Sequence, residues 1–97
     1  MELLLNEQDV VDSVCVFTAE KEYTNPENID VDLAFHPSYG FSAMALVSGR
    51  KKNLDEQDLI DAIAVYLRDY HNFDPHRLLV ELSFSENDGV TASVRVS

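Results

Sequence analysis

The amino-acid sequence predicts an α+β fold in which a helix-strand-strand unit occurs twice, in the order αββαββ. Three observations predict it. The chain aligns with itself at a shift of 49 residues, each copy begins with a helix-capping sequence, and each copy ends with two alternating apolar runs around a glycine turn. A chain of 97 residues has room for one hydrophobic core, so we expect a single domain spanning residues 1–97.

The self-alignment joins residues 5–47 to residues 54–96 without a gap, and 13 of the 43 aligned positions carry the same residue. Composition alone would give roughly a third as many identities. We therefore interpret residues 5–47 and 54–96 as an internal repeat, with residues 48–53 as the connector between the copies. The identical pairs include Leu5/Leu54, Glu7/Glu56, Asp9/Asp58, Phe35/Phe84 and Gly40/Gly89.

Each copy opens with the same helix-start chemistry. Asn6 and Asp55 are expected N-caps, because their side chains can accept a hydrogen bond from an otherwise unpaired amide of the first turn. Asp9 and Asp58 stand at the third helical position and complete a capping box. This predicts helices near residues 6–22 and 55–71. The buried stripes are expected at Val10, Val11, Val14, Val16 and Phe17, and at Leu59, Ile60, Ile63, Leu67 and Tyr70.

A proline ends each helical run, because the residue before proline is steered out of helical geometry. Alternating apolar residues after Pro26 and Pro75 then predict strands over residues 29–35 and 78–84. Turns that end in Gly40 and Gly89 lead into return strands over residues 41–47 and 90–96.

One helix and two strands bury too little apolar surface alone, so the copies are expected to pack together. We predict one four-stranded antiparallel sheet with two helices on one face. The opposite face is mostly polar, but Met44, Leu46 and Leu79 are apolar. We interpret these three residues as an interaction surface for a protein partner or for self-association, with a homodimer as one outcome.

The composition disfavours several classes of partner. The formal net charge is -11, with 18 acidic and 7 basic residues, and such a surface repels phosphate backbones. Direct nucleic-acid binding is therefore not expected, and Arg50-Lys51-Lys52 is interpreted as a solvated loop. No apolar run is long enough to span a membrane and no signal sequence is visible, so we expect a cytoplasmic protein without membrane contact.

No residue set predicts catalysis, a metal or a cofactor. His71, Asp74 and His76 lie close in sequence but do not make a complete zinc-ligand set. Cys15 has no basic neighbour that would lower its pKa, and it is the only cysteine. The repeated acids are explained by helix capping and solvated helix faces. We expect no catalytic residues and a protein that is not an enzyme.

The strings LNEQDVVD and LDEQDLID, the central YGFSA and the terminal DGVTASVRV resemble a YxcD-like family of small acidic bacterial proteins, a domain of unknown function. The resemblance covers nearly the whole chain. It implies a bacterial cytosolic origin, and it transfers no catalytic or binding residues.

Three functions remain open at this point. The first is a non-catalytic interaction or regulatory module. The second is an acidic nucleic-acid mimic that inhibits a basic protein, whose binding would weaken steeply with salt. The third is a small-molecule or metal-binding domain, which needs a pocket between the elements.

Overall fold

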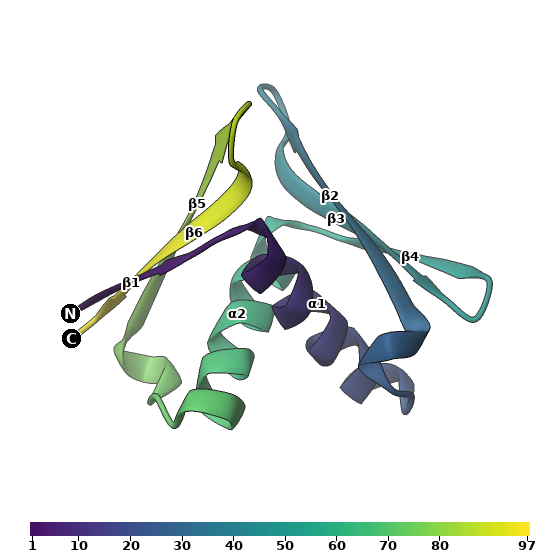
Figure 1. Cartoon of the computed structure of the whole chain (residues 1–97), viewed down its shortest axis with the longest axis horizontal. Helices are drawn as coiled ribbons and strands as arrows, with labels where there is room; N and C mark the ends of the chain where they lie inside the picture. The colour runs from purple at the N-terminus through teal and green to yellow at the C-terminus, as the bar shows by residue number, and fades with distance from the viewer.

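The computed structural model describes residues 1–97 and contains two three-stranded antiparallel sheets with two helices packed against them (Figure 1). Each half of the chain has the same order of elements: strand, α-helix, short 3-10 helix, strand, strand. The first half comprises β1 (Glu2–Leu5), α1 (Glu7–Glu22), η1 (Pro26–Asn28), β2 (Ile29–His36) and β3 (Gly40–Val47). The second half comprises β4 (Arg50–Leu54), α2 (Glu56–His71), η2 (Pro75–Arg77), β5 (Leu78–Ser85) and β6 (Gly89–Val96).

The α+β class is confirmed, but the single four-stranded sheet is wrong. The strand orders are β1-β6-β5 and β2-β3-β4. Each predicted hairpin gains a third strand from the segment before a helix, and three strands bury an apolar face that a two-stranded hairpin cannot. Residues 48–53 are accordingly not a connector. Only Ser48 and Gly49 form a turn, and Arg50-Lys51-Lys52, predicted as a loop, belongs to β4.

Each sheet contains strands from both halves of the chain. β1 opens the first half but pairs with β6 at the other end of the sequence, with Leu3 opposite Val94. β4 opens the second half but pairs with β3, with Lys52 opposite Ala45. The two chain ends therefore lie side by side (Figure 1). The units of the structure start at β1 and β4, a few residues before the predicted repeat bounds of 5 and 54.

The capping predictions are confirmed at both helices. The Asp9 amide donates to Asn6 Oδ1 at 2.8 Å, and the Asn6 amide donates to the Asp9 carboxylate at 3.0 Å. Asp55 and Asp58 make the same reciprocal pair at 2.8 and 2.9 Å. These caps satisfy amides that no helical carbonyl can reach, and they turn the chain sharply from strand into helix.

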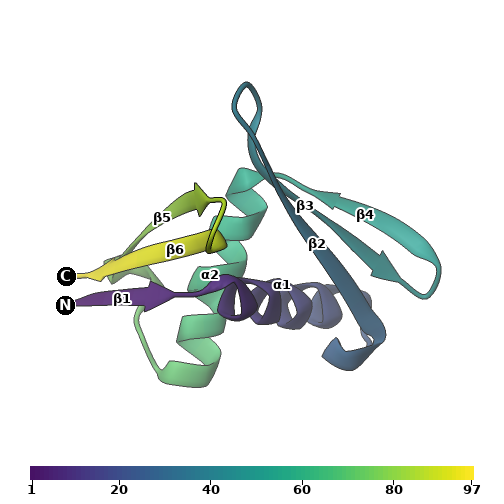
Figure 2. The ribbon, with the colours of Figure 1, turned by 45° about the horizontal axis from the view of Figure 1, so that its top comes forward.

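The helices cross and pack against each other and against the inner faces of both sheets (Figure 2). Val14 and Phe17 of α1 share a core cluster with Ala43 of β3, and Ile63 and Leu67 of α2 share another with β6. The predicted stripes are therefore right at their centres. They are wrong at Tyr70, which is 58 % exposed in the last turn of α2 and stacks on Tyr66.

The two sheets meet at the tips of their hairpins. Phe35 of β2 and Phe84 of β5, which are aligned by the 49-residue shift, stack with ring centroids 5.1 Å apart, and Phe41 packs on Phe35 at 4.8 Å. Such aromatic pairs add to the stability gained from buried area. The Phe35 and Phe84 rings stay partly exposed to solvent. Each stands at the end of the predicted inward face of its strand, where the pair forms an aromatic bridge between the two sheets.

A glutamate from each helix ties the opposite half of the chain to it. Glu7 accepts a hydrogen bond from the Val90 amide at 3.1 Å, and Glu56 accepts one from the Phe41 amide at 3.2 Å. The edge strand has already ended at these positions, so each carboxylate replaces a missing strand partner. The close approach of the Glu7 carboxylate to the Val90 amide requires glycine at position 89, because a Cβ there would collide with Glu7.

Gly89→Ala is expected to destabilise the protein more than Gly49→Ala. Both glycines have positive φ, +69 and +81, so both substitutions cost about 1–2 kcal/mol of backbone strain. Only Gly89→Ala also displaces Glu7 and breaks its charged hydrogen bond, worth about 1.5–3 kcal/mol, because Gly49 faces open space. Urea unfolding of both variants, each with and without Glu7→Ala, measures the difference. Equal losses in the two variants would contradict this account of Gly89.

Thr18→Val is expected to stabilise the protein by about 1 kcal/mol. Thr18 is 5 % exposed on α1 and its hydroxyl has no hydrogen-bond partner, whereas the aligned residue in α2 is Leu67. Valine keeps the shape and removes the unpaired group. The matched control is Ser13→Ala, because the Ser13 hydroxyl donates to the Asp9 carbonyl at 2.8 Å. The urea midpoint should rise more for Thr18→Val than for Ser13→Ala, whose hydroxyl is already paired, and a fall for Thr18→Val would refute the assignment.

Candidate interaction surfaces

Met44 and Leu46 lie side by side on the outer face of the β2-β3-β4 sheet. β3 is the central strand, and its inward residues Ala43, Ala45 and Val47 fill the core, so alternation turns Met44 and Leu46 to solvent. They are 39 % and 38 % exposed. The arrangement is an apolar centre on a regular, hydrogen-bonded strand.

Polar residues flank this apolar pair on both neighbouring strands. Across the sheet, Leu46 stands between Asp30 of β2 and Lys51 of β4. Met44 stands between Asp32 and Asn53 in the next row. The outer face therefore has acids along one edge, apolar side chains in the middle, and a base and an amide along the other edge.

A hollow of about 470 Å³ opens beside Met44. It forms where the cap at Asp55 turns the chain away from the sheet, so that β3 continues past Leu54 without a neighbour on that side. The lining mixes apolar and polar side chains: Asp32, Ala34, Ser42, Ala43, Met44, Asn53 and Leu54.

Leu79 lies elsewhere. It is on β5 in the other sheet, 54 % exposed and opposite Arg95 of β6. The outer faces of the two sheets point in different directions (Figure 1). The structure therefore does not join Leu79 to Met44 and Leu46, because the single four-stranded sheet that would have placed them on one face does not exist.

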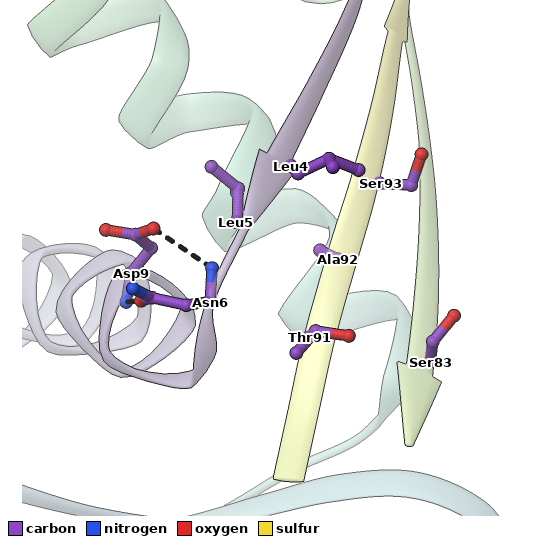
Figure 3. A pocket seen from close by; sticks show the side chains of 8 residues that line it. All are labelled: Leu4, Leu5, Asn6, Asp9, Ser83, Thr91, Ala92 and Ser93. Carbon is purple, nitrogen blue, oxygen red and sulfur yellow. Dashed lines mark hydrogen bonds between the residues drawn. The ribbon is translucent and has the colours of Figure 1, made fainter. Parts of the chain in front are cut away.

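The same hollow recurs at the other sheet, where β1 leaves β6 for α1, with a volume of about 360 Å³ (Figure 3). At the 49-residue shift Met44 aligns with Ser93 and Ala34 aligns with Ser83, so this copy is lined by hydroxyls. Its one carboxylate, Asp9, is hydrogen-bonded to the Asn6 amide (Figure 3). That acid is therefore part of the helix cap.

Cys15 lies half-buried on α1, with its Sγ donating weakly to the Ile29 carbonyl at 3.7 Å. Burial raises the pKa of the thiol, and the nearby charges of Asp12 and Asp30 raise it further. The thiolate, which is the nucleophilic form, is thus disfavoured.

The histidines remain apart from any ligand set. His71, Asp74 and His76 are exposed, and the Asp74 carboxylate accepts the His76 amide at 3.0 Å within η2. His36 accepts the Ser38 amide at 3.0 Å in the β2-β3 turn. No three His, Cys, Asp or Glu side chains of the chain gather closely enough to hold a metal ion together.

Two features of the surface had no clear sequence signal. The edge of β1 was missed because four residues are too few for a period-2 pattern to stand out. The bridge between Phe35 and Phe84 was missed because it forms between separate sheets. Neither helix is both long enough and apolar enough to cross a membrane.

Iodoacetamide is expected to modify Cys15 in the folded protein at least about tenfold more slowly than in the urea-unfolded chain at pH 7.5. The raised pKa lowers the thiolate fraction, and the side chain is partly buried. The rate should rise with pH as the thiolate forms. Mass spectrometry follows the reaction, and equal rates in the folded and unfolded states would contradict the burial of the thiol.

Comparisons with known proteins point to one family. A family model described as "Protein of unknown function (DUF2653)" matches residues 1–88. The uncharacterized protein YxcD of Bacillus subtilis (strain 168) is 38% identical over 55 residues, which is 56% of this chain and 54% of that protein. The match thus spans about half the length of this curated relative. No solved structure matches the chain.

Proposed function

The chain belongs to the YxcD-like DUF2653 family of proteins of unknown function, and we propose from its surface that it is a non-catalytic interaction module. Its binding surface in this proposal is the outer face of the β2-β3-β4 sheet, and its ligand is a partner protein. Met44 and Leu46 would form the centre of the contact.

The observation that carries the proposal is the exposed apolar pair Met44 and Leu46 beside a hollow of about 470 Å³. Protein interfaces combine an apolar centre with a polar rim, and Met is enriched at such centres. An apolar side chain of the partner would enter the hollow and contact Met44. This insertion would remove apolar surface from water at the centre of the contact, where binding energy concentrates.

The charged edges of the same face support a defined orientation of the partner. Asp30 and Asp32 line one edge, and Lys51 lies on the other. A partner with bases opposite β2 and an acid opposite Lys51 would be favoured, whereas the reversed arrangement would place like charges together.

The other sheet provides an internal comparison. At the positions aligned with Met44 and Leu46 it carries Ser93 and Arg95. The same strand geometry therefore accommodates polar residues, so the fold does not require apolar ones there. This difference between two similar strands supports a binding role for Met44 and Leu46.

Met44→Ser combined with Leu46→Arg is expected to reduce partner binding at least about tenfold while leaving stability nearly unchanged. The substitutions copy the residues of the other sheet. The partner is first identified by a photo-crosslinking residue at Asp30, which lies opposite Leu46 on the same face but outside the hollow, in the native host. Calorimetric titration of the purified partner then compares wild type and variant. Glu86→Gln is the matched control, because it changes the net charge by the same +1 in the exposed β5-β6 turn.

Salt separates this function from the alternative of an acidic nucleic-acid mimic. Binding through the apolar pair should change little between 50 and 300 mM salt, whereas binding by an array of carboxylates should weaken steeply. Full binding by the double variant together with steep salt dependence would overturn the proposal in favour of the mimic.

A further inference from the structure

β1 is an edge strand whose outer side has free backbone groups. Met1 and Val96 exchange backbone hydrogen bonds, at 2.9 Å from the Val96 amide and 3.4 Å from the Met1 nitrogen. Antiparallel pairing alternates, so Met1, Leu3 and Leu5 bond to β6 while Glu2 and Leu4 point their N–H and C=O groups away from it. The free side of β1 therefore presents two donors and two acceptors.

The corresponding edge strand, β4, carries basic side chains that disfavour pairing with another strand. Glu22, at the end of α1, pairs with Arg50 at 3.5 Å and with Lys52 at 3.7 Å. Lys51 adds a third base on the same short strand. Basic residues on an edge strand are a known protection against pairing with another strand, because their charge would be buried in a joined sheet.

β1 lacks these bases: its one charged side chain, Glu2, aligns with Lys51 and accepts a hydrogen bond from Ser93 Oγ at 2.8 Å. At the 49-residue shift Arg50, Lys52 and Glu22 correspond to Met1, Leu3 and His71. In place of ion pairs there is a mainly apolar hollow of about 190 Å³ along β1. Its lining comes from β1, the end of α2 and the following loop: Leu3, Leu4, Leu5, Leu67, His71 and Phe73. Leu4 is 77 % exposed on the same strand.

We propose that a second copy of this chain pairs with β1 edge to edge, in antiparallel orientation about a two-fold axis at Leu3. Glu2 of each copy stands opposite Leu4 of the other in this register. All four free backbone groups of each strand are then satisfied. The two sheets join into one continuous six-stranded sheet, and each Leu3 meets the other at the hollows beside β1.

The geometry favours a second copy over a different strand because the edge is self-complementary. Any antiparallel strand would satisfy the free backbone groups, but a two-fold axis through Leu3 also places the apolar hollow of one copy against that of the other. The pairing extends the existing β5-β6-β1 sheet without new structure. It is independent of Met44 and Leu46, which lie on the other sheet.

The contact is small and opposed by charge. Four-residue strands bury less than the roughly 1,200 Å² of a standard interface, so the dimer is expected to be weak and to form only at high protein concentration. Each copy carries a net charge of -11, so added salt should strengthen the dimer by screening repulsion.

Sedimentation of the untagged chain is the first test. The wild-type mass should rise from 11.0 kDa toward twice that value with increasing concentration, more readily at 300 mM than at 50 mM salt. Leu4→Pro should weaken association at least about tenfold, because it removes an outward N–H that β6 does not use. Asn53→Pro is the matched control. It places proline at the aligned outward position of β4, and it should leave dimerisation unchanged.

A cysteine crosslink tests the register. Facing residues of a non-hydrogen-bonded antiparallel pair lie about 4.5 Å apart at Cα, within the range that a disulfide spans. In a Cys15→Ala background, Leu3→Cys should therefore form a disulfide-linked dimer on mild oxidation, while Lys52→Cys should not.

A constant mass of 11.0 kDa up to millimolar concentration would overturn the proposal, as would dimers that persist in Leu4→Pro. A Leu3→Cys variant that crosslinks no better than Lys52→Cys would overturn it as well. Partner binding through Met44 and Leu46 is measured separately and should survive Leu4→Pro, so failure of one proposal is distinguishable from failure of the other.

Discussion

The pairing of each helix-leading strand with the hairpin of the opposite half holds this structure together. β1 completes the sheet of β5 and β6, and β4 completes the sheet of β2 and β3. A two-stranded hairpin is marginal in water, whereas three strands over a helix can bury a continuous apolar face. β4 follows β3 directly through the Ser48-Gly49 turn, but it opens the second half of the chain. β1 opens the first half and pairs with β6 at the far end of the second. The two halves therefore depend on each other for their sheets.

The same arrangement sets the positions of the helices. One residue separates each helix from its edge strand, because the capping boxes at Asn6 and Asp55 turn the chain at that residue. Glu7 and Glu56 stand at the first helical position and reach the amides that the edge strand no longer covers. The end of the edge strand, the helix cap and the glutamate thus form one continuous arrangement, which occurs at the start of both helices. The aromatic bridge of Phe35 and Phe84 closes the other end of the sheets.

The two sheets have similar backbones but carry different surface residues at aligned positions. The apolar pair Met44 and Leu46 faces solvent where the other sheet has Ser93 and Arg95. The edge of β4 is covered by Glu22 with Arg50 and Lys52, where the edge of β1 has Leu3 and His71. The fold is satisfied by either version at each position, so folding alone does not account for the difference. Surface chemistry that differs between equivalent strands is therefore the basis of both proposals made for this chain.

Local chemistry was readable in the sequence by itself. The helix starts, the glycine turns and the four long strands were predicted correctly, because caps, positive-φ turns and apolar alternation depend on residues a few positions apart. The family resemblance was also readable and is confirmed. Tertiary structure alone decided which strands pair. β1 and β4 are too short and too irregular in pattern to stand out, and their partners lie in the other half of the chain. That choice separated Leu79 from Met44 and Leu46, left β1 with an open edge, and placed Phe35 on Phe84. Each of these features depends on contacts between residues far apart in sequence, which no local pattern encodes.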